Sequence, residues 1–124
     1  MSNNKLLMII ELGGYPNFAP LYEGLGYEVE QATSMRKALG LLKKTDYSVV
    51  VCEFNFQSDF RDRTSSLESM MAVLQSRPET RIVVFYEKEF EHQFERVRSR
   101  FPIHAALSFP IDESLLSRSL EPQA

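Results

Sequence analysis

Residues 27–53, YEVEQATSMRKALGLLKKTDYSVVVCE, place an extended segment, an amphipathic helix and a buried strand in close succession. Ser34 is a favourable N-cap for a helix over 35–44, where apolar residues recur on one face and two lysines occupy the last turn. The run 49–52, VVVC, is continuously apolar, which is typical of a parallel strand covered on both faces. This stretch therefore predicts a strand–helix–strand unit of an α/β domain.

The same alternation continues on both sides of this stretch. Apolar runs at 6–10 and 82–85 predict two more buried strands, and residues 27–31 and 105–109 predict two weaker ones. Apolar spacing and capping residues predict helices over four further ranges: 18–25, 67–76, 89–100 and 113–120. The alternation predicts one α/β domain with a five-stranded parallel sheet and helices on both faces.

Length and composition restrict the class of protein. The chain has 124 residues, enough for one domain with its own core, and a net charge of −3 that argues against general nucleic-acid binding. Its single cysteine, Cys52, lies in an apolar run and fits a reducing compartment. No signal peptide or membrane-spanning segment is evident, so we expect a cytoplasmic protein with no membrane or nucleic-acid partner.

Three stretches resemble the receiver domain of two-component response regulators. They are residues 5–11 (KLLMIIE), the quoted stretch 27–53, and residues 107–110 (LSFP). The resemblance extends over about residues 5–120 of a single domain, 1–124. It implies a doubly wound, flavodoxin-like sheet with strand order 2-1-3-4-5 and a role in two-component signal transduction.

The resemblance also identifies the positions of a phosphorylation site. Receivers carry two acids after the first strand, which hold Mg²⁺, and an aspartate after the third, which accepts the phosphoryl group. A threonine or serine follows the fourth strand and a lysine the fifth. In this chain these five positions carry Ile10, Glu11, Glu53, Tyr86 and Phe109.

Most of these substitutions remove the chemistry of the site. Phosphoryl transfer relies on positioning and on charge neutralisation around the transferred group. Ile10 removes a Mg²⁺ ligand, and Phe109 removes the fixed cation. Glu53 keeps the charge of the acceptor but adds a methylene group, which misplaces an in-line attack. We therefore expect a degenerate receiver, a pseudo-receiver, with no phosphorylation, no cofactor and no enzymatic activity.

Several interpretations of these positions stay open. Glu53 either mimics a phosphorylated aspartate or is a remnant acid, and Glu11 with Glu53 forms either a weak metal site or a structural pair. Tyr86 and Phe109 form either a recognition surface or the filling of an emptied pocket. The family's switch aromatic falls on Ala106, and we hypothesise that the larger Tyr86 occupies the volume that Ala106 leaves.

A protein partner is expected because no catalytic site remains. The connection 55–63, NFQSDFRDR, mixes aromatic and arginine side chains as partner sites do, although a mobile loop with its phenylalanines tucked in is an equal interpretation. The candidate partner contacts are Phe56, Phe60, Arg61, Phe90 and Phe94. The resemblance implies a second surface, formed by 89–100, 105–109 and 113–120, that receivers use for dimerisation.

The expected partner is a signalling kinase, a regulator or an output protein. Three other functions stay open. In the first, the chain is an unusual phosphoacceptor in a phosphorelay, through Glu53 or Asp59. In the second, it binds a small molecule in an apolar pocket at Ile10, Tyr86 and Phe109. In the third, it is a metal-dependent hydrolase built on the same sheet.

Overall fold

Five parallel strands form one sheet in the order β2-β1-β3-β4-β5, which confirms the predicted architecture and strand order. The computed structural model describes residues 4–10, 17–53, 70, 72–76, 79–99 and 103–120. The strands are β1 (Lys5–Ile9), β2 (Glu28–Ala32), β3 (Val49–Glu53), β4 (Arg81–Tyr86) and β5 (Ala105–Ser108). The helices are α1 (Ala19–Gly24), α2 (Met35–Lys44), α5 (Glu91–Arg98), which follows a 3-10 turn η1 (Lys88–Phe90), and α6 (Glu113–Ser119).

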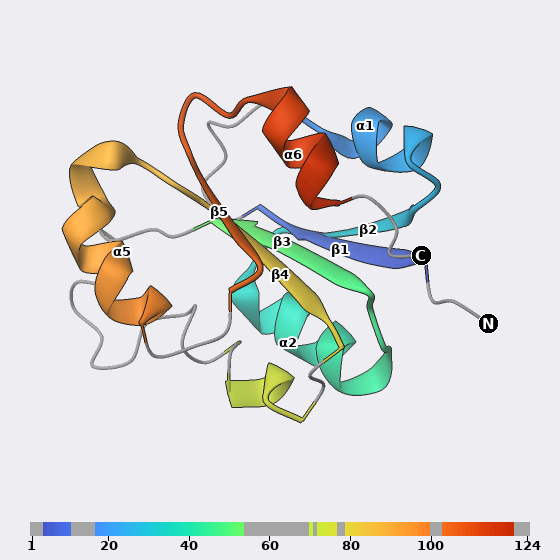
Figure 1. Ribbon diagram of the computed structural model, residues 1–124. Helices are drawn as coiled ribbons and strands as arrows, with labels where there is room; N and C mark the ends of the chain where they lie inside the picture. The colour runs from blue at the N-terminus through green and yellow to red at the C-terminus, as the bar shows by residue number, and fades with distance from the viewer. Residues whose placement is uncertain are drawn as a thin grey trace.

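Helices cover both faces of the sheet (Figure 1). Helices α1 and α6 pack on one face through Tyr22 and Leu116, and α2 and α5 pack on the other through Leu42 and Phe94. Residues 70 and 72–74 are also helical, and Met70 packs on the same face as α2. Successive residues of the central strands alternate between these two clusters, so each run must be apolar throughout.

Local sequence explains where the helices begin and end. The Ser34 hydroxyl accepts a hydrogen bond from the Lys37 amide at 3.2 Å, so the predicted N-cap and the predicted bounds of α2 are confirmed. Helix α1 ends at Gly24, and Gly26 has a φ of 98°, a left-handed conformation that favours glycine. Asp112 caps α6 by accepting from the Ser114 amide at 2.8 Å.

The predicted helix over 89–100 begins later than expected. Residues Lys88–Phe90 form the 3-10 turn, and the α-helix occupies Glu91–Arg98. No helix among the described residues is long and apolar enough to cross a bilayer.

Candidate functional site at the carboxyl ends of the strands

Four of the predicted site positions lie at the same edge of the sheet, where parallel strands end. Ile10 follows β1 and is half-buried, Glu53 ends β3, and Tyr86 ends β4. Phe109 follows β5 and its amide donates to the Tyr86 carbonyl at 2.9 Å. Glu11 lies outside the described residues. The backbone therefore brings these positions together as the resemblance implies.

Glu53 is the one buried charged side chain among the described residues, with 6% of its surface exposed. It borders a small cavity whose walls come from β1, α1, β3 and β4. The residues that line the cavity are Met8, Ile9, Ile10, Phe18, Tyr22, Val51, Cys52, Glu53 and Phe85. The cavity volume is about 20 Å³, the space that one or two water molecules need.

Tyr22 of α1 contributes a hydroxyl group that sequence reasoning missed. The side chain is fully buried, and its hydroxyl has no hydrogen-bond partner among the described residues. Burial raises the pKa of this hydroxyl well above its ordinary value, so it stays neutral, and Tyr22 lines the same cavity as Glu53. A tyrosine in an amphipathic helix gives no sequence signal of this position.

Tyr86 and Phe94 form a stacked aromatic pair between β4 and α5. Their ring centroids are 4.7 Å apart and the ring planes differ by 16°. Phe94 is fully buried. The expected partner contact at Phe94 is therefore wrong, because the side chain is part of the core beneath Tyr86. Phe90 is half-buried and stays a candidate contact.

Tyr86 lies on the same face of the sheet as Ala106. The strand register pairs Val84 with Ala106, so Tyr86, two residues beyond Val84, is a diagonal neighbour of Ala106 on that face. Both side chains are half-buried and pack against the same apolar cluster. The Tyr86 ring is thus directed inward, as the hypothesis of a volume exchange with Ala106 requires.

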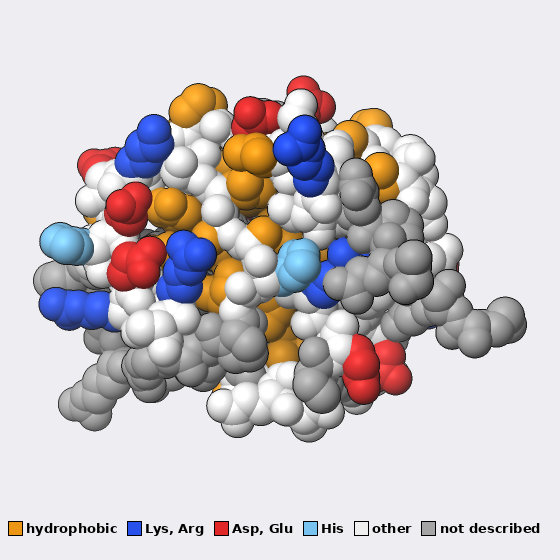
Figure 2. Space-filling view, in the orientation of Figure 1, with side chains coloured by type: hydrophobic (Ala, Val, Ile, Leu, Met, Phe, Trp, Pro, Cys, Tyr) orange, Lys and Arg blue, Asp and Glu red, His pale blue; other side chains and the backbone are white. Residues whose placement is uncertain are grey.

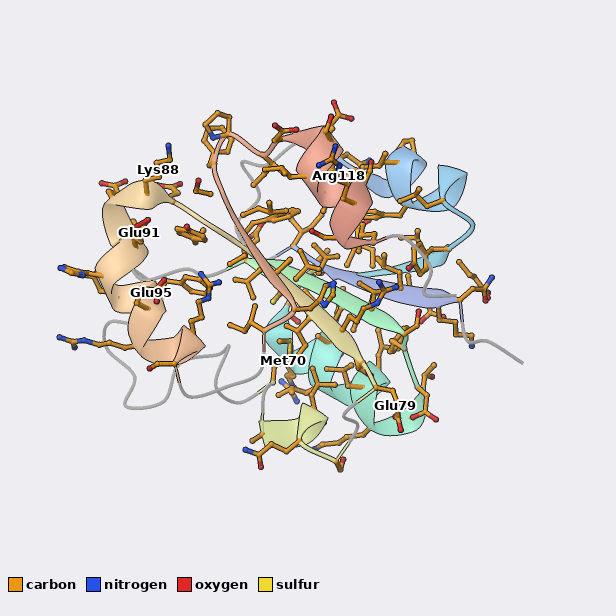
Figure 3. All side chains as sticks on the ribbon, viewed as in Figure 1. Met70, Glu79, Lys88, Glu91, Glu95 and Arg118 are labelled. Carbon is orange, nitrogen blue, oxygen red and sulfur yellow. The ribbon has the colours of Figure 1, made fainter. Side chains whose placement is uncertain are left out.

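Large apolar side chains are exposed beyond β5. Phe109 is 43% exposed and Leu115 of α6 is 49% exposed. Figure 2 shows hydrophobic side chains in the middle of the face formed by α5, β5 and α6, with charged side chains around them. Figure 3 places Lys88, Glu91 and Glu95 on the α5 side of this face and Arg118 on the α6 side. The surface has an apolar centre and a charged border.

Three candidate contacts and the metal prediction stay untested. Phe56, Phe60 and Arg61 lie outside the described residues. Within the described part of the chain no three metal-ligating side chains gather, and the pair of Glu11 and Glu53 remains a prediction.

A polar network at the opposite edge of the sheet was not predicted. The Arg81 guanidinium donates to the Tyr27 hydroxyl at 2.6 Å and to the Ser119 carbonyl at 3.3 Å, and Tyr27 donates to the Leu120 carbonyl at 2.5 Å. His104 lies 3.1 Å from the same Ser119 carbonyl. These contacts satisfy carbonyl groups at the end of α6 and fix the position of that helix.

Comparisons with known proteins support the fold. No protein-family model and no curated protein sequence matches the chain. The structure is similar to a response regulator receiver domain from Clostridium thermocellum, with a TM-score of 0.72, 18% identity, and coverage of 93% of this chain and 89% of that chain. It is also similar to a response regulator receiver protein from Sinorhizobium medicae WSM419, with a TM-score of 0.72, 17% identity, and coverage of 95% and 91%.

A third similar structure carries the name of an enzyme. It is described as an adenylate cyclase from Rhodopirellula baltica, with a TM-score of 0.69, 14% identity, and coverage of 95% of this chain and 84% of that chain. The absence of enzymatic activity in the present chain therefore stays a prediction. Likeness at these identities establishes architecture, and the chain has the fold of response regulator receiver domains.

Proposed function

We propose that this chain is a receiver-like signalling module that binds a protein partner and accepts no phosphoryl group. The observation that carries the proposal is the stacking of Tyr86 on buried Phe94. Receivers have a small hydroxyl side chain at the Tyr86 position, where it hydrogen-bonds the phosphoryl group. A ring held parallel to a core phenylalanine at 4.7 Å belongs to the packing of α5.

The neighbouring positions supply little charge neutralisation. Phosphoryl transfer needs cations and oriented donors around the equatorial oxygens. Ile10 and Phe109 are apolar where receivers have a metal-binding acid and a lysine. Glu53 is buried and is one methylene group longer than the aspartate that receivers place there, so an in-line attack is misplaced. These features favour a module that works without catalysis.

The cavity beside Glu53 is too small to be the site of a small-molecule ligand. Ligand pockets have volumes of roughly 300–1,000 Å³. The cavity holds about 20 Å³, so it accepts water and excludes a metabolite.

The surface formed by α5, β5 and α6 is the proposed partner site. Phe109 and Leu115 expose large apolar side chains there, and such patches bordered by charge are typical of protein interfaces. Phe90 lies half-buried at the start of this surface. A signalling kinase, a regulator or an output protein is the class of partner we propose.

Phosphorylation is tested by incubating the protein with acetyl phosphate and Mg²⁺ and measuring the intact mass. We expect no mass increase of one phosphoryl group, while a phosphorylatable receiver domain treated in parallel gains one. Uptake of a phosphoryl group by this chain would show that the proposal is wrong.

Partner binding is tested with Leu115→Ser and Phe109→Ser. Both remove exposed apolar surface, so a partner co-purified from the source cells should bind these variants more weakly. Glu79→Ala is the matched control, because Glu79 is an exposed residue that precedes β4 on a distant part of the molecule (Figure 3). Equal binding by all three variants would contradict the proposal that this surface binds the partner.

A further inference from the structure

The solvent face of α2 is strongly basic. Its ten residues include Arg36, Lys37, Lys43 and Lys44, all exposed, and no acidic residue. The net charge of the chain is −3, and these four residues contribute +4, so the other 114 residues carry a net charge of −7. A basic helix on an otherwise acidic protein has an uneven charge distribution that favours acidic partners.

The four cations surround a glycine. With 3.6 residues per turn, their side chains fall within an arc of about 120° around the helix, and Gly40 lies at its centre. Gly40 is exposed, and a Cβ atom built there has no heavy atom within 4 Å. Its lack of a side chain costs about 1 kcal/mol relative to alanine in a helix interior. Because Gly40 has no side chain, another chain can approach the backbone of the helix closely at this position.

An exposed acidic segment lies elsewhere on the same chain. Glu87, Glu89 and Glu91 are exposed at the start of α5, and Glu89 lies in the turn η1. A hydrogen bond that the Glu87 carboxyl donates to the Glu89 carboxylate raises the pKa of Glu87, with smaller contributions from burial and from the charge of Glu89, which shows that these carboxyl groups lie close together. Cations brought against them would relieve that repulsion.

We propose that the basic face of α2 binds the acidic start of α5 in a second copy of this chain. The two surfaces have opposite charge, and Gly40 allows the second copy to approach the α2 backbone. The partner is a protein and not a polyanion, because the net charge of −7 outside α2 repels nucleic acid and anionic membranes. The acidic start of α5 borders the surface of α5, β5 and α6 proposed above for a signalling partner, but the basic face of α2 lies outside that surface, and this contact does not rest on that proposal.

The contact is small and electrostatic. A ten-residue helix is about 15 Å long, so the interface falls in the class of weak interfaces below about 1,200 Å². Exposed charges separated by more than a Debye length of about 10 Å at 0.1 M salt are screened. Self-association should therefore appear at low salt and high protein concentration, and weaken as salt rises.

Sedimentation velocity of the full chain over a concentration series, at low and high salt, measures this association. Arg36→Glu with Lys37→Glu lowers the charge of the basic face from +4 to 0, and Glu87→Lys with Glu89→Lys changes the charge of residues 87–91 from −2 to +2. Each double variant alone should associate at least about tenfold more weakly than the natural chain. An equimolar mixture of the two should regain association, because opposite charges face each other again.

Gly40→Leu tests the close approach without a change of charge. The side chain has open space and leucine favours helix, so the variant should unfold no more easily than the natural chain while its association is lost. Arg118→Glu and Glu113→Lys, on exposed residues of α6, should associate as the natural chain does. The proposal is overturned if the chain stays monomeric at low salt, if the mixture of the two double variants stays monomeric, or if only the α6 variants lose association.

Discussion

The two edges of the sheet use opposite means of holding the structure together. At the amino edge, Arg81 donates hydrogen bonds to the Tyr27 hydroxyl and to the Ser119 carbonyl, and Tyr27 donates to the Leu120 carbonyl. At the carboxyl edge, Tyr86 stacks on Phe94, and Ile10 borders a cavity of only about 20 Å³. Receivers place their polar chemistry at the carboxyl edge. In this chain that edge is held largely by packing, and the directional polar contacts lie at the edge where no chemistry is expected.

If packing holds the carboxyl edge together, the largest loss of stability should follow from a substitution at Phe94. Phe94→Ala removes a fully buried ring and the stack on Tyr86, so the free energy of unfolding should fall by about 3–5 kcal/mol. Denaturant unfolding measures this change. Phe90→Ala is the matched control and should cost less, because Phe90 is half-buried. A loss no larger than that of the control would mean that the stack contributes little.

Arg81 tests the amino edge. Arg81→Met keeps much of the aliphatic stem but leaves the Tyr27 hydroxyl and the Ser119 carbonyl without this donor, so unfolding should become easier by about 1–3 kcal/mol. Arg96→Met, on an exposed residue of α5, should change stability by less than about 0.5 kcal/mol. A double-mutant cycle with Tyr27→Phe measures the coupling, and independent effects would argue against a network.

Alkaline pH should weaken the fold through Tyr47, which precedes β3. Burial, together with a hydrogen bond that the hydroxyl donates to the Glu30 carboxylate, raises the pKa of Tyr47 from 10.0 to about 12. The unfolded chain therefore loses this proton first, and stability should fall as the pH rises from 10 to 12. In Tyr47→Phe, unfolding measured over this range should depend less steeply on pH. An unchanged slope would assign the decline to other groups.

The smallest change in stability is expected from a substitution at Phe109. Phe109→Lys restores the receiver's lysine on a side chain that is 43% exposed, so stability should change by less than about 0.5 kcal/mol. The variant should still gain no phosphoryl group from acetyl phosphate, because Tyr86, Ile10 and Glu53 are unchanged. Phosphorylation of this single variant would show that the lysine alone had been limiting.

The sequence predicted the sheet well because its signals are local. The continuous apolar runs gave β1, β3 and β4, weaker patterns gave β2 and β5, and Ser34 with the amphipathic repeat gave the bounds of α2. Helical spacing also predicted that Phe94 lies on an apolar face, but it could not separate a partner contact from a core contact, since that depends on Tyr86 across the β4–α5 connection.

The candidate site was predicted only in position. The resemblance located Ile10, Glu53, Tyr86 and Phe109 at one edge, and the structure places them there. The buried hydroxyl of Tyr22 and the contact between Arg81 and Tyr27, which are 54 residues apart, depend on tertiary packing and have no sequence pattern.

The central claim is that the carboxyl edge does not respond to a phosphoryl group, and amide NMR tests it most directly. The ¹⁵N-labelled protein is titrated with Mg²⁺ and then with beryllofluoride, which mimics a bound phosphoryl group. The account predicts no saturable shifts at Glu53, Tyr86 or along α5. Saturable shifts at Glu53 that extend through Tyr86 into α5 would contradict it and would identify a working switch with unusual site residues.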